Sequence, residues 1–217
     1  MVYAASNRLS PGSYNCPTSE ETVGLKQPLP KIMNPSKVQD AKQKDAVVKD
    51  LPGDMMTLRT AVEKSRNGVA WYVYDDITPE LGMSYLTQMR FDNIVPDDYY
   101  PASALGGFTY GATTEEMAGA YSALADSGRY KEPTCIVKML DNEGNNVFEE
   151  YPVIQVYQEN TANVMTDILK GVISRGTAAS MGWRSSIEAA GKTGTTNSSK
   201  DGWFCGMTPY YTISVWV

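Results

Sequence analysis

Residues 187–217 read IEAAGKTGTTNSSKDGWFCGMTPYYTISVWV and determine most of what can be expected of the fold. Three short stretches rich in apolar and β-branched residues predict strands over 187–195, 203–207 and 212–217. Asn, Ser, Gly and Pro residues, which favour turns, separate them. Because strands this close in sequence pair most simply with their neighbours, we expect an antiparallel meander.

The chain before these strands carries mainly helical patterns. Apolar residues recur every three or four positions, and hydroxyl side chains that can cap a helix precede several of these segments. Turn residues at 141–145 lie between two strand-like segments and predict a hairpin over 134–149, whereas residues 6–54 are interpreted mainly as loop. The predicted helices run from Thr57 to about 64, over 69–75, from Thr78 to about 89, from Thr113 to Gly128, and over 161–174.

Composition excludes several classes of function. The 217 residues are 42% hydrophobic and 20% charged, as in ordinary globular proteins, but include no histidine, which rules out His-dependent triads and the commonest zinc sites. The three cysteines stand far apart and are interpreted as small hydrophobic residues, so we expect no metal and no cofactor. A net charge of −6 without basic clusters argues against nucleic acid. No membrane-spanning segment or signal pattern is visible in the sequence.

Residues 191–196, Gly-Lys-Thr-Gly-Thr-Thr, are the first group that could carry chemistry. A nucleotide phosphate loop is disfavoured, because it would need a glycine where Ser186 stands and a helix afterwards. On a strand, Lys192 and Gly194 would share one face, and Thr193 and Thr195 the other. An extended peptide could pair with this strand, its carboxylate held by the lysine charge and the threonine hydroxyls. An edge strand kept soluble by a lysine explains the same residues equally well.

Ser65, Arg66 and Asn67 form the second group, at the junction of two predicted helices. Alone, they are more simply interpreted as helix caps, a role that Ser and Asn often fill. Together with the Lys-Thr-Gly of residues 192–194, however, they resemble two of the three motifs of penicillin-binding proteins.

The resemblance to this family covers residues 55–217 densely. Residues 104–111, Ala-Leu-Gly-Gly-Phe-Thr-Tyr-Gly, together with 116–121, are similar to a stretch typical of bifunctional, class A members. The chain departs from the family most clearly in one respect: no serine precedes a lysine by three positions, so the Ser-x-x-Lys nucleophile motif is lacking. The chain also stops in the middle of what should be the last strand. We therefore expect a partial transpeptidase domain over 55–217, truncated at both ends, after a loop-rich segment, 1–54, that follows the missing nucleophile helix.

The resemblance implies an α+β fold of the serine β-lactamase and penicillin-binding transpeptidase type. Its antiparallel sheet is flanked by helices and is expected to be incomplete here. An unpaired sheet edge would then be exposed, and we expect chains to associate through it. The longer protein is expected at the extracytoplasmic face of the bacterial cell membrane, with its membrane anchor outside these residues.

The resemblance also implies a function, that of a peptidoglycan D,D-transpeptidase. Such an enzyme cross-links stem peptides ending in D-Ala-D-Ala through an acyl-serine intermediate, and it binds penicillin and other β-lactams, which mimic that peptide end. Because losing the nucleophile of a serine enzyme costs on the order of a millionfold in rate, we expect this chain alone to be inactive. A natural non-catalytic protein that binds cell-wall peptides or partner proteins is the alternative.

Roles for individual residues follow from the same resemblance. Ser65 would relay protons between the missing lysine and Lys192, and Asn67 would hold the substrate amide. The threonines would bind the terminal carboxylate, and the backbone N–H of Thr195 would be one oxyanion donor. The implied catalytic residues are Ser65, Asn67 and Lys192, and the implied substrate-binding residues are Thr193, Gly194 and Thr195.

Overall fold

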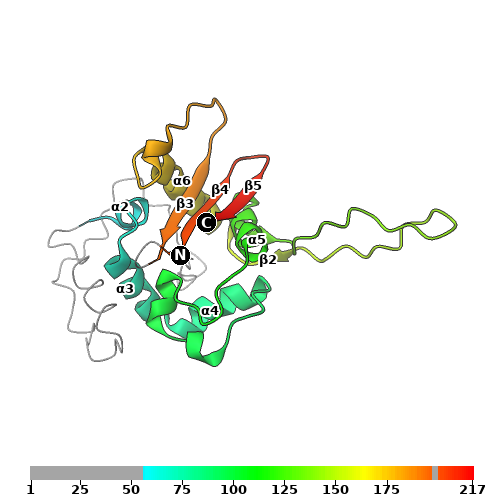
Figure 1. Ribbon diagram of the computed structural model, residues 1–217, viewed down its shortest axis with the longest axis horizontal. Coiled ribbons are helices and arrows are strands. Elements are labelled where there is room, and N and C mark those ends of the chain that lie inside the picture. The colour runs from blue at the N-terminus through cyan, green and yellow to red at the C-terminus, as the bar shows by residue number, and fades with distance from the viewer. Residues whose placement is uncertain (1–55, 197–199) are drawn as a thin grey trace.

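Three antiparallel strands at the carboxyl-terminal end form the main sheet of the computed structural model, which describes residues 56–196 and 200–217 (Figure 1). They are β3 (Ala190–Thr195), β4 (Gly202–Met207) and β5 (Thr212–Trp216), in the spatial order β3-β4-β5. Lys192 on β3 lies opposite Cys205 on β4, which lies opposite Ser214 on β5. The predicted meander is confirmed, although β3 begins at Ala190 rather than at residue 187.

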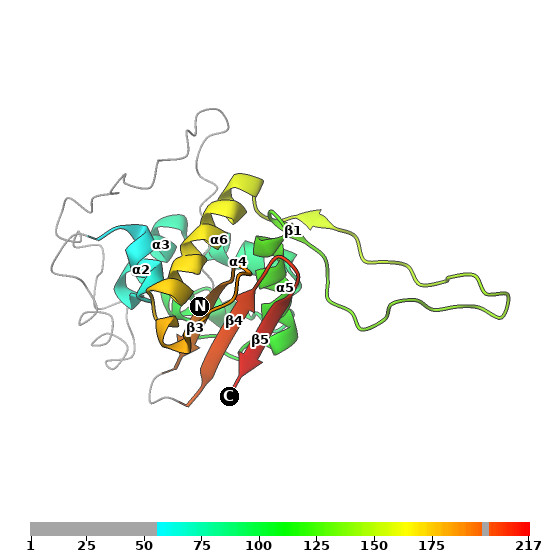
Figure 2. The ribbon, with the colours of Figure 1, turned by 90° about the horizontal axis from the view of Figure 1, so that it is seen from above.

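Two helices, α5 (Thr114–Ala125) and α6 (Glu159–Ser174), pack against this sheet (Figure 2). Helix α5 begins with a complete capping box, in which the Thr113 hydroxyl accepts from the Glu116 N–H and the Glu116 carboxylate accepts from the Thr113 N–H. Such a cap satisfies two backbone donors that have no partner within the helix. The prediction of a helix starting at Thr113 is therefore confirmed.

Three shorter helices form the first part of the described chain: α2 (Leu58–Glu63), α3 (Asn67–Ile77) and α4 (Pro79–Gln88). Thr57 caps α2 as predicted, since its hydroxyl accepts from the Thr60 N–H. Two details were wrong. Helix α3 begins at Asn67 instead of residue 69, and Thr78 makes no side-chain cap, because its φ of 71° lies in the left-handed region. Pro79, with its fixed φ, begins α4 without that cap.

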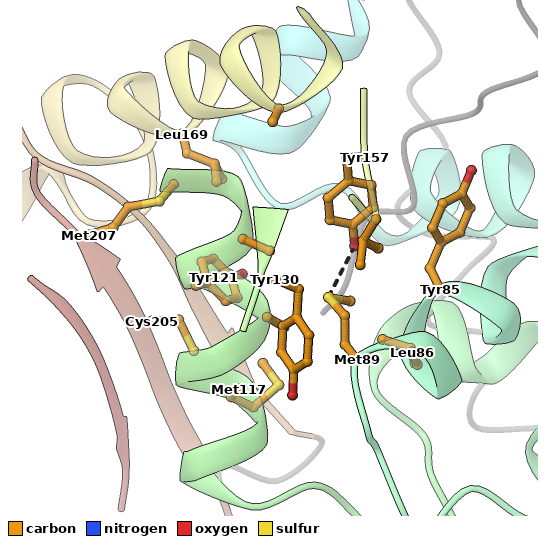
Figure 3. Close-up of a cluster of buried hydrophobic side chains, with 14 of the residues drawn as sticks. Tyr85, Leu86, Met89, Met117, Tyr121, Tyr130, Tyr157, Leu169, Cys205 and Met207 are labelled. Atoms are coloured by element: carbon orange, nitrogen blue, oxygen red, sulfur yellow. Dashed lines mark hydrogen bonds between the residues drawn. The ribbon is translucent and has the colours of Figure 1, made fainter. Parts of the chain in front are cut away.

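The hydrophobic core lies around α5, between the sheet and α4 (Figure 3). Met117 and Tyr121 of α5 lie near Cys205 on β4, and Met89 after α4 is fully buried on the other side. The hydroxyl of Tyr157 lies 3.9 Å from the Met89 sulfur, and burial raises the pKa of that hydroxyl. This core fixes the position of β4 and therefore of β3, the strand paired with it.

Residues 131–153, called the arm below, extend away from the rest of the molecule (Figures 1 and 2). Two strands flank the arm, where β1 (Arg129–Tyr130) pairs antiparallel with β2 (Ile154–Gln155). The two strands predicted within 134–149 were wrong: a single bridge joins Leu140 and Asn146, around the predicted turn. High β-propensity is not enough here, because no packed surface covers the apolar side chains, and Val137 is 90% exposed.

The remaining described residues form turns and three short 3₁₀ helices, η2 (Pro96–Asp98), η3 (Pro101–Leu105) and η4 (Ala179–Met181). Cys205 is buried as interpreted, but Cys135 on the arm is exposed, so the interpretation as a buried hydrophobe was wrong there. Cys16 and the loop-rich segment 1–54 lie outside the described residues. No helix in 56–196 or 200–217 is long and apolar enough to cross a membrane.

Candidate active site

Ser65 lies at the sharp turn between α2 and α3. Its N–H donates to the Val62 carbonyl, the next N–H, of Arg66, donates to the Ala61 carbonyl, and together these bonds end α2. The φ of Ser65 is 54°, in the left-handed region that non-glycine residues seldom adopt and that often marks functional positions. Asn67 follows as the first residue of α3. The turn therefore brings Ser65 and Asn67 to the junction of the two helices.

Lys192 is one of the few buried charged residues, with 2% of its surface exposed. It shares a face of the sheet with Cys205, directly opposite it on β4, and this is the face on which the core lies. Its Nζ donates to Ser65 Oγ at 2.8 Å and to its neighbour's carbonyl, that of Thr193, at 2.7 Å. The structure thus joins the two sequence motifs, although Ser65 and Lys192 are 127 positions apart.

Burial changes the acid–base behaviour of Lys192. Removal from water disfavours the charged ammonium and lowers the pKa of Lys192 from 10.5 to about 8. Near neutral pH, an appreciable fraction of such an amine is unprotonated and able to accept a proton. The Ser65 hydroxyl lies within hydrogen-bond distance of this amine, which is the geometry that proton exchange between two groups requires.

The β3 strand presents its threonines differently from its lysine. Thr193 is half-buried and Thr195 is exposed, both on the face opposite Lys192, as strand alternation predicts. The N–H of Thr196 donates to the Asp201 carbonyl on the β4 side, at 3.1 Å. Because N–H groups alternate along a strand, the N–H of Thr195 points to the opposite edge, which no strand covers within the described sheet. A strand edge without a paired strand is the kind to which an extended peptide can add as a further strand.

Two glycines of the Gly-Lys-Thr-Gly segment meet steric demands of the sheet itself. A Cβ on Gly191 would lie 2.8 Å from the Cys205 carbonyl oxygen, and one on Gly194 would lie 3.1 Å from Trp203 Cβ. Packing within the sheet therefore favours glycine at both positions. Gly194 lies on the same face as Lys192, as expected, and the atom that a Cβ there would meet belongs to the paired strand.

Sequence reasoning missed a second set of polar residues beside the site. The hydroxyl of Thr177 lies 2.6 Å from that of Thr193, and the carboxylate of Glu63 is buried and paired with Arg175. Glu63 and Arg175 are 112 positions apart, so no local spacing predicts their contact. The one available signal was Gly176, since a glycine can mark a place where two backbones approach closely.

The described chain offers no evident metal site. Within 56–196 and 200–217, no group of three or more His, Cys, Asp or Glu side chains could hold a metal ion. The geometry suits proton transfer between the Ser65 hydroxyl and Lys192, a lysine whose pKa is about 8. The hydroxyls of the neighbouring threonines are of the kind that can donate to a carboxylate.

Comparison with known proteins identifies the family to which the chain belongs. The profile described as "Penicillin binding protein transpeptidase domain" matches residues 25–217. Penicillin-binding protein 1A of Clostridium novyi is 38% identical over 165 residues, which are 74% of this chain and 19% of that protein. Penicillin-binding protein 4 of Bacillus subtilis is 33% identical over 163 residues, which are 75% of this chain and 26% of that protein. The chain thus spans about a fifth to a quarter of the length of these relatives.

Solved structures show the same fold. The crystal structure of penicillin-binding protein 1A from Haemophilus influenzae has a TM-score of 0.63 at 23% identity, covering 74% of this chain and 29% of that one. The PonA1 protein of Mycobacterium tuberculosis in complex with penicillin V has a TM-score of 0.63 at 22% identity, covering 78% and 49%. The expectation of an incomplete α+β transpeptidase-like fold is confirmed.

Proposed function

This chain belongs to the penicillin-binding protein transpeptidase family, in its class A branch, and on that premise we propose that its site serves a peptidoglycan D,D-transpeptidase reaction. The observation that carries the proposal is the 2.8 Å contact between Lys192 Nζ and Ser65 Oγ. It joins two motifs of the family at a buried amine whose pKa lies near 8. The proposed substrates are stem peptides that end in D-Ala-D-Ala.

The proposed proton path runs through Ser65. A nucleophilic serine attacks the peptide carbonyl and forms an acyl-serine, and the terminal D-Ala leaves with a proton. The lysine of the Ser-x-x-Lys motif takes the proton of the attacking serine, and Ser65 relays protons between that lysine and Lys192, whose lowered pKa suits it for both accepting and donating. Since no Ser-x-x-Lys occurs in these 217 residues, we propose that the nucleophile is contributed from outside them and that the chain alone is inactive.

The remaining residues are assigned to substrate binding. Asn67, at the start of α3, holds the substrate amide. The hydroxyls of Thr193 and Thr195 bind the terminal carboxylate at the face of β3 opposite Lys192. The Thr195 N–H at the open strand edge donates to the developing oxyanion, and Gly194 lies between the two threonines.

β-Lactams are proposed to enter the same site, because they imitate the D-Ala-D-Ala end. The site is then at the extracytoplasmic face of the bacterial membrane, where peptidoglycan is cross-linked. The membrane anchor is proposed to lie in the longer protein. We also propose that residues 55–217 form the transpeptidase part of this chain.

Labelling with a fluorescent penicillin tests the function. We expect covalent label on a longer chain that carries the upstream Ser-x-x-Lys, and none on residues 1–217 alone. In the longer chain, Lys192→Ala should slow labelling by about a hundredfold or more, the usual effect of losing a proton-transfer group, whereas Lys138→Ala on the exposed arm should leave it unchanged. Label on the short chain would refute the assignment of the motifs. A longer chain that binds penicillin only reversibly would favour the non-catalytic binder.

We also propose that the 217-residue chain associates through its sheet edge. Strand β5 is the other edge of the described sheet, and Ile213, Val215 and Trp216 on it are about half exposed. Exposed strand edges with apolar side chains pair readily with other chains. Sedimentation velocity should detect dimers or larger species that dissociate on dilution, and a single monomeric species at all concentrations would contradict this.

A further inference from the structure

The proton-transfer pair and the carboxylate-binding strand are joined by a closed ring of contacts. Lys192 bonds to Ser65, and Thr193 follows Lys192 in the chain. The hydroxyl of Thr193 lies 2.6 Å from that of Thr177, and the Thr177 N–H donates to the Glu63 carbonyl at 3.1 Å. Glu63 closes the ring, because it stands two residues before Ser65. Thr177 is therefore held at a fixed place relative to both motifs.

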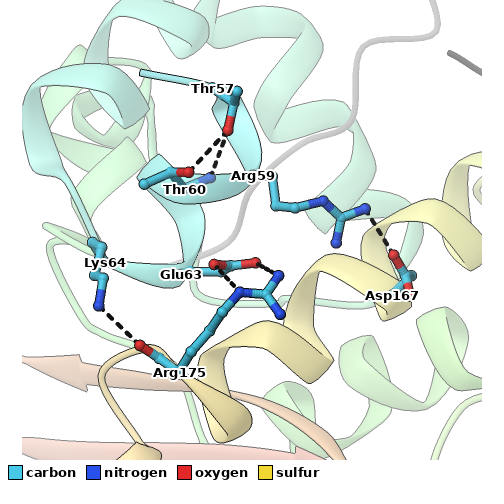
Figure 4. Close-up of polar contacts among 7 residues, drawn as sticks. All are labelled: Thr57, Arg59, Thr60, Glu63, Lys64, Asp167 and Arg175. Atoms are coloured by element: carbon cyan, nitrogen blue, oxygen red, sulfur yellow. Dashed lines mark hydrogen bonds and ion pairs between the residues drawn. The ribbon is translucent and has the colours of Figure 1, made fainter. Parts of the chain in front are cut away.

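A buried ion pair fixes the segment that carries Thr177 (Figure 4). The Glu63 carboxylate has 5% of its side-chain surface exposed, and it accepts from Nε of Arg175 at 2.9 Å and from a second nitrogen of the same guanidinium. Lys64 Nζ donates to the Arg175 carbonyl at 2.8 Å. Such a two-point Arg–carboxylate contact restrains orientation as well as distance.

Two glycines show how closely this segment approaches Glu63. A Cβ on Gly171 would lie 2.1 Å from Glu63 Oε1, and a Cβ on Gly176 would lie 2.4 Å from the Glu63 carbonyl oxygen. At Gly176 a Cβ would meet the backbone of Glu63, and at Gly171 it would displace the Glu63 side chain from its present position. The end of α6 and the residues after it are thus fitted to the end of α2, immediately before Ser65.

The chemistry of hydroxyls decides what the contact between Thr177 and Thr193 can do. A hydroxyl has one proton to donate, and its oxygen accepts. A carboxylate only accepts, so a Thr193 hydroxyl that binds one must donate its proton to the carboxylate. The oxygen of Thr193 is then left to accept, and Thr177, within hydrogen-bond distance, is the donor.

We propose that Thr177 is a positioning residue: its hydroxyl donates to Thr193 Oγ1 and directs the Thr193 proton toward the terminal carboxylate of the substrate. Glu63 and Arg175 hold Thr177 in place for this role. The proposal rests on the proposed function, since it assumes a carboxylate-ended substrate on β3. It assigns Thr177 to substrate recognition and leaves the proton transfer between Ser65 and Lys192 untouched.

The expected effect is modest and selective. Losing one neutral hydrogen bond at a solvent-accessible position corresponds to about a threefold to tenfold change in an equilibrium constant. In the longer chain with its nucleophile, Thr177→Val should weaken the initial binding of penicillin by this factor. The rate constant of acylation at saturation should stay unchanged. Thr177→Ser, which keeps the hydroxyl, should restore binding.

Controls separate this role from general damage. Thr60→Val breaks another threonine pair, with Thr57 at 3.0 Å, and should change neither constant. Penicillin methyl ester, which has no carboxylate, should bind equally to the unaltered chain and to Thr177→Val. Equal binding of penicillin by both chains would overturn the proposal, as would an equal loss with acid and ester. No acylation of the unaltered longer chain would refute the proposed function instead, together with the substrate on which this role depends.

Discussion

The arm and the Ser65–Lys192 site are stabilised by different kinds of contact. In the arm, hydrogen bonds are mostly local, as in the turn where Asp141 accepts from the N–H of Asn145, and several apolar side chains face solvent. In the site, the contacts join residues 112 and 127 positions apart, through Glu63–Arg175 and Ser65–Lys192. Because local stability follows buried and long-range contacts, we expect substitutions near the site to be costly and substitutions on the arm to be tolerated.

Among the ion pairs and hydrogen bonds, the largest effect is expected from Arg175→Ala, which leaves the buried Glu63 carboxylate without its partner. Removing one member of a buried ion pair typically costs 3–5 kcal/mol, and because the Arg175 side chain is 58% exposed we expect about 3 kcal/mol. Urea denaturation followed by circular dichroism measures this. Arg129→Ala, which breaks an exposed pair with Asp126, is the control and should cost less than about 1 kcal/mol. Equal losses in the two variants would remove the distinction between buried and exposed pairs.

A second buried carboxylate, that of Asp98, should make stability depend on pH. Burial alone would raise the pKa of Asp98, but hydrogen bonds from the N–H of Val95 and from the N–H and hydroxyl of Thr109 outweigh it, so the pKa is lowered. A lowered pKa in the folded state stabilises the protein above the unfolded value of about 4, and this contribution is lost as pH falls through the folded pKa.

Asp98→Asn tests this dependence. Its amide nitrogen cannot accept, so we expect a loss of about 1–2 kcal/mol at neutral pH. The variant should also lose less stability than the unaltered chain between pH 5 and pH 3. Thermal melting across this range provides the comparison, and Asp97→Asn, a neighbouring exposed carboxyl, is the control. Parallel stability curves for the unaltered chain and the Asp98 variant would contradict the assigned cause.

A smaller effect is expected at the amino end of α5. Thr113→Ala removes the side-chain half of the capping box, and loss of such a cap typically costs about 1 kcal/mol. Thr113→Ser keeps the hydroxyl and should retain most of the stability. Both follow from equilibrium unfolding curves, and a Ser variant as unstable as the Ala variant would show that the hydroxyl is not what matters.

The smallest effect is expected on the arm. Val137→Ser replaces a side chain that is 90% exposed, and its unfolding free energy should change by less than about 0.5 kcal/mol. Val172→Ser in α6, which is fully buried, is the matched comparison and should lose several kcal/mol through lost burial and an introduced polar group. A comparable loss at Val137 would mean that the arm packs more closely than its exposure indicates.

Local signals in the sequence predicted most of the elements near the site. Thr57 and the Thr113–Glu116 pair mark helix starts through hydrogen bonds between residues only three positions apart, so the local sequence is enough to predict them. The meander was predictable because its strands are close in sequence. The strands expected in the arm failed for the converse reason, since a strand needs a packed partner surface that propensity does not reveal.

The site was predictable only in part. Ser65 and Lys192 could be named from their motifs, and strand alternation placed Lys192 and Thr193 on opposite faces. Their meeting depends on how α2, α6 and β3 pack, which no spacing records. Thr177 and Glu63 were missed because their significance comes from contacts with distant residues, Thr193 and Arg175.

The central claim is that Lys192 is a buried amine that contacts Ser65 and has a pKa of about 8. Lysine labelled with ¹³C at Cε reports the protonation of each amine by NMR, and comparison with Lys192→Arg assigns the signal of this residue. Titration of the 217-residue chain should give Lys192 a pKa of about 8, well below those of the other lysines. A pKa near the ordinary 10.5 would show that the amine is in water, and would contradict its pairing with Ser65.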